Sequence, residues 1–213
     1  ESSDAILAVR SRLSSLSRRG VALITAFDPA YPARLRRLPD APPLLYVRSD
    51  SHTSHTLFSS ASSVFSAVNE VFTNRPCIAV VGAHEASEAG VAVATAWGQA
   101  LARRGIVVVS GLAAGIDAAA HRGALEVSGL TIAVVGAGLD RIAPQKNLPL
   151  AAQVVRSGAI LSEYPPETPA SVGRLLARNR IVGHTPPGLR PEADKRYLVG
   201  QVGFADAGDG TVV

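Results

Sequence analysis

A regular alternation of short apolar segments with helix-like segments, beginning at Cys77, constrains this fold more than any other feature. The apolar segments have strand length and show no inside/outside alternation. The predicted strands are Cys77–Val81, Ile106–Ser110, Thr131–Val135 and Ala159–Glu163, and the predicted helices are Ala86–Arg104, Ile116–Val127, Leu150–Arg156 and Val172–Ile181. Strands of this kind are buried on both faces, and helices between them make them parallel. The sequence therefore predicts an α/β fold with a Rossmann-like doubly wound, mainly parallel sheet.

The first 50 residues carry a short α/β extension of the same kind. A first helix ends at Gly20, and Val21–Thr25 and Leu44–Arg48 have the pattern of strands. Residues 51–66 differ, because eleven of these sixteen positions are Ser, Thr or His, which predicts an insertion or linker without a packed core. We therefore divide the chain into an N-terminal extension (1–50), an insertion or linker (51–76), a Rossmann-like core (77–182) and a loop-rich tail (183–213).

Composition excludes several classes of protein. Of the 213 residues, 47% are hydrophobic and 18% are charged, which supports a packed core. No apolar run approaches the ~20 residues of a membrane span, and no apolar leader opens the chain. The one cysteine, Cys77, excludes a disulfide scaffold and a thiolate zinc site. We expect a cytoplasmic protein that makes no membrane contact, and the absence of Met indicates that the chain has been trimmed at its start.

The positive charge of the chain is carried almost entirely by arginine. Of 21 basic residues only Lys146 and Lys195 are lysine, and the formal net charge is +4. Arginine binds phosphate with a planar, two-pronged donor set, so this balance favours phosphate contacts. On the last predicted helix Arg174 and Arg178 share a face and Arg180 follows. Such a helix suits a polyanion, although it is equally compatible with a plain solvated face.

Two strand-to-helix loops are candidates for binding an anion. Ligands of parallel sheets bind beyond the carboxyl ends of the strands, where Gly82 precedes His84 and Ser110 opens a loop with Gly111 and Gly115. Amides at such helix starts can converge on a phosphate, or the loops can be tight turns without a ligand. Four loops are expected along this edge of the sheet: 82–87, 111–115, 136–148 and 163–170.

Residues with catalytic potential are few. Asp117 and His121 stand four apart on one predicted helix, where they either form an acid–base couple or cap and brace the helix. No serine or cysteine lies in a nucleophile elbow, and Glu163 is a single carboxylate without a metal partner. Trp97 is expected in the core. We therefore predict no catalytic residue, no metal site and no cofactor.

One long glycine-rich segment and four shorter ones occur in a characteristic order. The long segment is VVVSGLAAGIDAAAHRGAL (107–125), and the others are DPAYP (28–32), IAVVG (78–82), LSE (161–163) and RNRI (178–181). Together they resemble the DNA-processing protein A family, also called DprA or Smf, over residues 21–181. The glycine-rich signature combined with the Arg-Asn-Arg element makes this resemblance specific.

The resemblance implies a binding protein and not an enzyme. Members of the family hold single-stranded DNA in a basic pocket of an extended Rossmann fold, usually as homodimers. They protect incoming DNA and help load a RecA-type recombinase during natural transformation. Sequence-tolerant, salt-sensitive binding through amides and basic groups agrees with the residues of this chain. The expected DNA- and phosphate-binding residues are Gly82, His84, Ser110, Gly111, Gly115, Lys146, Asn147, Arg178, Asn179 and Arg180.

The chain departs from the family pattern at several points. Where the family has arginine after serine or threonine, this chain has Ala83 and His84, and an imidazole is charged only when protonated. The Tyr-Pro pair expected before Asn147 is replaced by Ala-Pro. Residues 185–191 are turn-rich where the family has a closing strand, so the family's dimer surface is expected to differ.

Two other functions are compatible with the sequence. The first is a nucleotide-binding or nucleotide-processing enzyme on a related sheet, resembling the lysine-decarboxylase-like phosphoribohydrolases, whose proline–glycine–glycine–x–glycine–threonine motif is absent here. The second is a diverged homologue that has lost DNA binding and acts as an interaction module. A dehydrogenase fits poorly, because Arg141 stands where a dinucleotide fingerprint beginning at Gly136 requires its third glycine.

Overall fold

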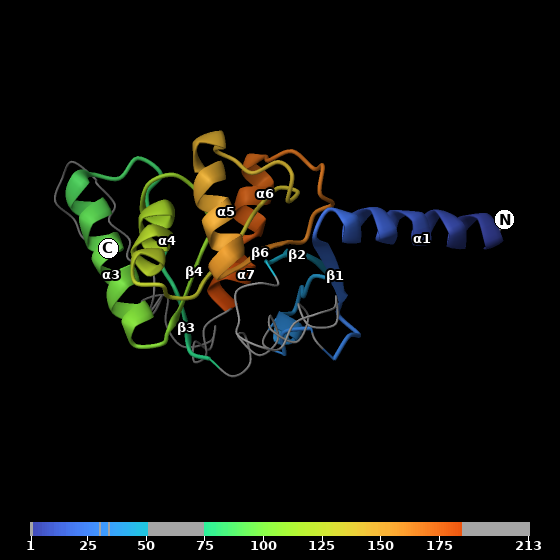
Figure 1. Cartoon of the computed structure of the whole chain (residues 1–213), viewed down its shortest axis with the longest axis horizontal. Coiled ribbons are helices and arrows are strands. Elements are labelled where there is room, and N and C mark those ends of the chain that lie inside the picture. The colour runs from blue at the N-terminus through green and yellow to red at the C-terminus, as the bar shows by residue number, and fades with distance from the viewer. Residues whose placement is uncertain (1, 30, 34, 51–74, 185–213) are drawn as a thin grey trace.

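The computed structural model describes residues 2–29, 31–33, 35–50 and 75–184, which form a six-stranded sheet flanked by helices (Figure 1). The strand order is β1-β2-β6-β5-β4-β3, in which β3 to β6 pair in parallel and β2 is antiparallel to both of its neighbours. The strands are β1 (Val21–Thr25), β2 (Leu44–Arg48), β3 (Cys77–Ala79), β4 (Val107–Ser110), β5 (Thr131–Val134) and β6 (Gly158–Ser162). The predicted α/β fold with a mainly parallel sheet is confirmed, and the two N-terminal strands extend this same sheet.

Helices cover both faces of the sheet. The crossover helices α3, α4 and α5 lie side by side on one face (Figure 1). On the opposite face, Ile181 and Val182 of α7 pack in one apolar cluster with Leu35 and Leu38 from the β1–β2 connection. The helical segments are α1 (Ser2–Arg18), η1 (Leu35–Arg37), α3 (Glu88–Arg103), α4 (Ile116–Glu126), η2 (Gln145–Asn147), α5 (Leu148–Ser157), α6 (Val172–Ala177) and α7 (Asn179–His184).

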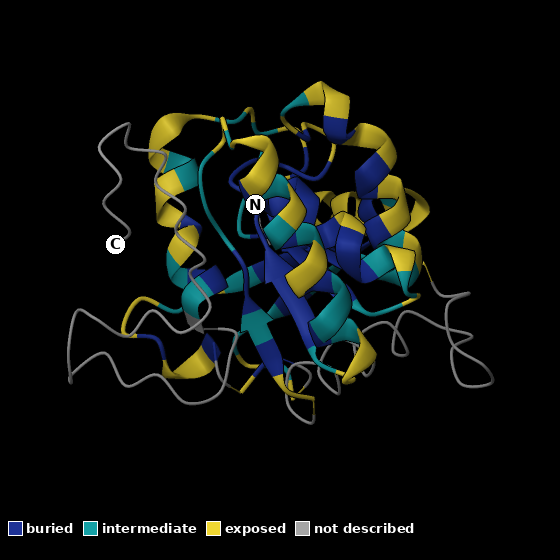
Figure 2. Cartoon of the chain, turned by 90° about the vertical axis from the view of Figure 1, so that its left-hand side faces the viewer, coloured by how far each residue is buried: buried dark blue, intermediate teal, exposed yellow. Residues whose placement is uncertain are grey.

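The central strands are buried from both sides, as the buried colouring of the interior shows (Figure 2). In β4, Val107 and Val109 pack on the α7 face and Val108 packs against α3 and α4. Because both faces are covered, such a strand is apolar on both sides, and the hydroxyls of the buried Ser110 and Thr131 donate to backbone carbonyls. The absence of alternation in the sequence therefore has a direct structural cause.

Two helices differ from their sequence-based description, and a third helix projects from the sheet. The helix predicted over residues 172–181 is divided into α6 and α7 at Arg178, whose side chain is buried. The prediction that Trp97 lies in the core is wrong, since this residue is 48% exposed on α3. Helix α1 projects from the sheet (Figure 1), and Leu16 near its end is buried whereas Ile6 and Leu13 are exposed.

Most of the predicted insertion (51–76) and of the predicted tail (183–213) lies outside the described residues, and residues 183–184 of the tail belong to α7. The segments concerned are 51–74 and 185–213, and they include the turn-rich stretch 185–191. The division of the chain at residues 50, 76 and 182 therefore stays a prediction. Within the described ranges, no helix has the length and apolar character needed to cross a membrane.

Helices α3 and α4 approach closely through two glycines. A Cβ atom on Gly98 would lie 2.3 Å from the carbonyl oxygen of Ala120, and one on Gly123 would lie 2.1 Å from the carbonyl oxygen of Thr95. Each distance is far shorter than a van der Waals contact. The atoms concerned belong to the backbone, so they cannot move without moving the helix. The glycines thus fix the spacing of the two helices that follow β3 and β4.

We predict that Gly123→Ala lowers the free energy of unfolding by about 1–3 kcal/mol, because the added methyl group must push α3 and α4 apart. Urea denaturation monitored by circular dichroism measures this change. Gly173→Ala is the matched control, since a Cβ there meets no atom within 4 Å. Equal stability of the two variants would contradict the close approach.

Candidate nucleic-acid interface

The loops after the parallel strands meet at one edge of the sheet, as expected. The Ile116 N–H donates to the Ala83 carbonyl at 3.2 Å, which joins the loops after β3 and β4. The Gly138 N–H donates to the Thr168 carbonyl at 2.8 Å, which joins the loops after β5 and β6. Strand β1 runs in the direction of β6, so the turn after β1 opens at this edge as well.

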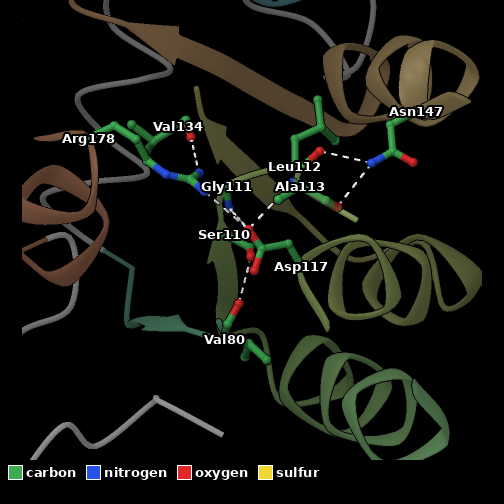
Figure 3. A network of polar contacts seen from close by, with 9 residues as sticks. All are labelled: Val80, Ser110, Gly111, Leu112, Ala113, Asp117, Val134, Asn147 and Arg178. Atoms are coloured by element: carbon green, nitrogen blue, oxygen red, sulfur yellow. Dashed lines mark hydrogen bonds and ion pairs between the residues drawn. The ribbon is translucent and has the colours of Figure 1, made fainter. Parts of the chain in front are cut away.

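Asp117 holds the glycine loop 111–115 from inside the protein (Figure 3). Its Oδ2 accepts hydrogen bonds from the N–H groups of Gly111 at 3.1 Å and Ala113 at 3.4 Å, and the residue is 2% exposed. Two amides that were expected to face a phosphate are therefore bound by the chain's own carboxylate. The amides of Leu112 and Gly115 donate to no acceptor in the described part of the chain.

Arg178 completes this buried network (Figure 3). Its guanidinium donates to the Val134 carbonyl at 2.5 Å and forms an ion pair with Asp117 at 3.3 Å. Burial lowers the pKa of Arg178, and the neighbouring carboxylate of Asp117 opposes this effect. A Cβ atom on Gly111 would lie 1.3 Å from the Nη1 atom of Arg178, so this position requires glycine. Arg178 therefore packs on the loop and does not face solvent.

Three further predicted residues also support the loop. The Asn147 side chain is buried and its Nδ2 donates to the carbonyls of Leu112 at 2.9 Å and Ala113 at 3.0 Å. The buried Ser110 hydroxyl donates to the Val80 carbonyl at 2.6 Å. Gly115 has φ +70°, and a Cβ atom there would collide with the backbone of the β3 loop. The loop is thus fixed before any ligand binds.

Four of the five remaining predicted residues lie at the surface of this edge. His84, Lys146 and Asn179 are exposed, and Gly82 is half-buried. Lys146 precedes Asn147, whose side chain contacts the glycine loop, so its ammonium group is carried on a segment fixed to that loop. The exposed side chains of Lys146 and His84 and the unpaired amides therefore occur together where the loops after β3, β4 and β5 meet.

Arg180 is already bound to two carboxylates. Its guanidinium donates to Asp40 at 2.7 Å and to both oxygens of Glu163 at 2.6 and 3.2 Å. Partial burial works against its charge, but the hydrogen bonds and charges of Glu163 and Asp40 raise the pKa of Arg180 overall. A phosphate would have to compete with these carboxylates, of which Asp40 is the more exposed.

The two open interpretations of Asp117 and His121 are resolved by the structure. Asp117 binds the loop amides, whereas the Nδ1 atom of His121 lies 2.6 Å from the Thr131 hydroxyl, which itself donates to the Val108 carbonyl. The two residues do not form an acid–base couple. In the described part of the chain, no group of three or more His, Cys, Asp or Glu side chains is arranged to hold a metal ion.

Other backbone segments of the chain occupy the space beside the two glycines of the loop after β5. Cβ atoms on Gly136 and Gly138 would lie 2.6 Å from the Arg174 carbonyl oxygen and 2.1 Å from the Pro166 carbonyl oxygen. These glycines therefore allow α6 and the segment after β6 to pack closely. The two glycines resemble a dinucleotide fingerprint, but in this fold they are needed for close packing.

Comparison with known proteins identifies the family. The family model of DNA recombination-mediator protein A matches residues 59–185. The chain belongs to this family. Among curated members it is 39% identical over 161 residues to protein Smf of Synechocystis and 33% identical over 182 residues to protein Smf of Escherichia coli. These alignments cover 75% and 85% of this chain but 36% and 44% of the relatives, so the chain spans less than half of their length.

Solved structures of DprA proteins share the fold. The X-ray structure of DprA from Streptococcus pneumoniae matches with a TM-score of 0.65 and 32% identity, over 81% of this chain and 54% of that one. A structure of DprA from Helicobacter pylori, described by its single-stranded DNA binding mode, matches with a TM-score of 0.62 and 25% identity, over 78% and 66%. The predicted DprA/Smf resemblance is confirmed.

His121 should make the stability of this DprA-family chain depend on pH. Burial lowers the pKa of His121 from 6.5 to about 3, with smaller contributions from Arg178 and Arg122. The unfolded chain therefore takes up a proton between these values that the native chain cannot bind. We predict that stability falls as the pH is lowered through this window, by at most about 1.4 kcal/mol per pH unit from this residue.

The prediction is tested by urea denaturation between pH 7 and pH 4, for the unmodified chain and for His121→Asn. The asparagine side chain can still contact Thr131 but does not titrate. We expect the variant to show a shallower dependence of unfolding free energy on pH. Parallel curves for the two proteins would rule out a neutral buried imidazole as the cause.

Proposed function

We propose that this chain binds single-stranded DNA at the carboxyl edge of the sheet and acts, as a DprA protein, in DNA uptake and recombination without catalysing a reaction. One observation carries the proposal: a rigid glycine loop leaves amides unpaired beside the exposed side chains of Lys146 and His84. Amides and cations bind the phosphate backbone without reading base sequence. Membership of the family and the single-stranded DNA binding described for the Helicobacter pylori protein support it.

The expected site residues divide into two roles. Those at the surface contact the strand, and those inside position the loop. The proposed contacts are Gly82, His84, Gly115, Lys146, Asn179 and, once a phosphate replaces Asp40, Arg180. The proposed positioning residues are Ser110, Gly111, Asn147 and Arg178, with Asp117 added by its contacts with the loop amides.

Properties of the whole protein follow from the family alone. We propose a cytoplasmic location, a homodimer and a RecA-type recombinase as partner. The chain covers 36% to 54% of the DprA and Smf relatives from Synechocystis, Escherichia coli and Bacillus subtilis, so these properties of the whole protein are proposals for this chain. The contacts of the described residues support only the DNA-binding part of the proposed function.

Lys146→Ala should weaken binding of a labelled oligothymidylate by roughly 3- to 10-fold, because one phosphate contact is lost. It should also reduce the slope of log affinity against log salt concentration by about 0.7, the value for one contact on a single strand. Fluorescence anisotropy at several salt concentrations measures both quantities.

Arg103→Ala is the matched control for charge. Arg103 is exposed at the far end of α3, which begins at the candidate edge and runs away from it. We expect this variant to bind like the unmodified chain. An unchanged salt slope in Lys146→Ala would contradict the proposed site, and hydrolysis of a nucleoside monophosphate by the purified protein would favour the enzyme alternative.

Asp40→Asn should strengthen DNA binding by roughly 3- to 10-fold, because it removes one of the two carboxylates that compete with phosphate for Arg180. The gain should disappear when Arg180→Ala is added. Asp4→Asn on the projecting helix α1 changes the total charge equally and is the control. If both asparagine variants strengthen binding to the same extent, net charge and not Arg180 explains the effect.

A further inference from the structure

The turn after β1 presents a phenylalanine almost completely to solvent. Phe27 is 97% exposed, more than any other large hydrophobic residue in the described ranges. Its ring buries almost no surface against this fold. Water-exposed aromatic surface is available to a partner that offers a flat apolar face.

This turn is held by its own hydrogen bonds. Asp28 accepts from the backbone and the hydroxyl of Thr25 at 3.2 and 3.1 Å and donates its own N–H to the Thr25 carbonyl at 2.9 Å. Arg36 donates to the Ala26 carbonyl at 3.2 Å and the Asp28 carbonyl at 2.8 Å, so both neighbours of Phe27 are fixed. A residue on such a braced turn loses little backbone freedom when it binds a ligand.

Arg36 is fixed in turn by an aromatic ring. Its guanidinium lies 5.7 Å from the centroid of Tyr31, and the Tyr31 hydroxyl donates to the Pro42 carbonyl at 2.8 Å. Burial raises the pKa of Tyr31 to about 12, so this hydroxyl keeps its proton and its hydrogen bond at neutral pH. The turn that exposes Phe27 is therefore supported by packed residues beneath it and is not an isolated loop.

The Phe27 turn continues the proposed DNA-binding edge. Asp40, from the same β1–β2 connection, is bound to Arg180, which links this segment to α7. Strand β1 lies two positions from β6 and five from β3 in the sheet, which corresponds to roughly 10 and 24 Å at the usual strand spacing. A single strand of several nucleotides can extend over this distance, since sites for unpaired DNA cover about 4–16 nucleotides.

We propose that Phe27 is a base-stacking residue that extends the contact with single-stranded DNA from the glycine loop to the turn after β1. The inference rests on the proposed function. It adds a contact to the bases, whereas the other proposed residues contact the phosphates. An aromatic ring stacks on any unpaired base, so this contact is sequence-tolerant but excludes duplex DNA, whose bases are already stacked. Exposed Arg37 lies in the same segment and supplies a cation for the adjoining phosphates.

Alanine and leucine substitutions separate stacking from simple apolar contact. We expect Phe27→Ala to weaken oligothymidylate binding by about tenfold and Phe27→Leu to weaken it nearly as much, whereas Phe27→Tyr retains binding. The salt slope should stay that of the unmodified chain, in contrast to Lys146→Ala. Trp97→Ala is the matched control, because this second exposed aromatic residue of the described ranges lies nine positions into α3, roughly 14 Å from the edge.

A spectroscopic measurement tests the stacking directly. Trp97 is the sole tryptophan of the chain, so Phe27→Trp combined with Trp97→Phe gives a protein whose indole fluorescence comes from position 27 alone. We expect oligothymidylate to quench this emission and a duplex of the same length to leave it unchanged. Equal affinity of Phe27→Ala and the unmodified chain, or emission that does not respond to bound oligothymidylate, would overturn the inference.

The two proposals fail in different ways. If the unmodified chain does not bind oligothymidylate, the proposed function is wrong and the Phe27 inference falls with it. If the unmodified chain binds, and Lys146→Ala but not Phe27→Ala weakens binding, the edge is correct and the stacking role alone is overturned. Because Phe27 buries almost nothing in the fold, its variants should unfold at the same urea concentration as the unmodified chain.

Discussion

The buried contact between Arg178 and Asp117 is the interaction on which the organisation of the sheet edge depends. It joins the α6–α7 junction to the first turn of α4, 61 residues apart in the chain, and both side chains are almost fully buried. Removing one partner of such a pair leaves an uncompensated buried charge, which is strongly destabilising. The pair is also surrounded by hydrogen bonds to the backbone of Val134, Gly111 and Ala113, so its charges are compensated locally.

This arrangement explains why a DprA-type signature combines small residues with charged ones. The glycine at position 111 makes room for a guanidinium, and the carboxylate of Asp117 fixes the amides around it. Asn147 then binds the carbonyl groups of the same loop. Much of the signature therefore builds the loop, and the proposed contact with DNA lies on the surface that this construction leaves exposed. Preorganised donors of this kind lose little entropy when a ligand arrives.

The edge is not a uniform basic patch, because carboxylates pair with some of its basic side chains and leave others exposed. Arg178 is neutralised inside, Arg180 is shared between two carboxylates, and Lys146 and His84 remain at the surface. A site with few unpaired cations depends more on backbone amides and on base stacking for its affinity. Under the proposed function, Phe27 adds stacking and the carboxylate of Asp40 competes with phosphate for Arg180, and both residues belong to the N-terminal extension.

The sequence by itself determined the strands, most of the helices and the edge at which the loops meet. Apolar runs without alternation, such as Val107–Val109, specify a doubly covered parallel strand because no position can face water. Tertiary structure decided which motif residues face inward. Arg178 and Arg180 are two positions apart in the sequence, yet one is buried against Asp117 and the other is bound to Asp40, 140 residues away. Such pairings depend on packing between distant segments, and local periodicity does not encode them.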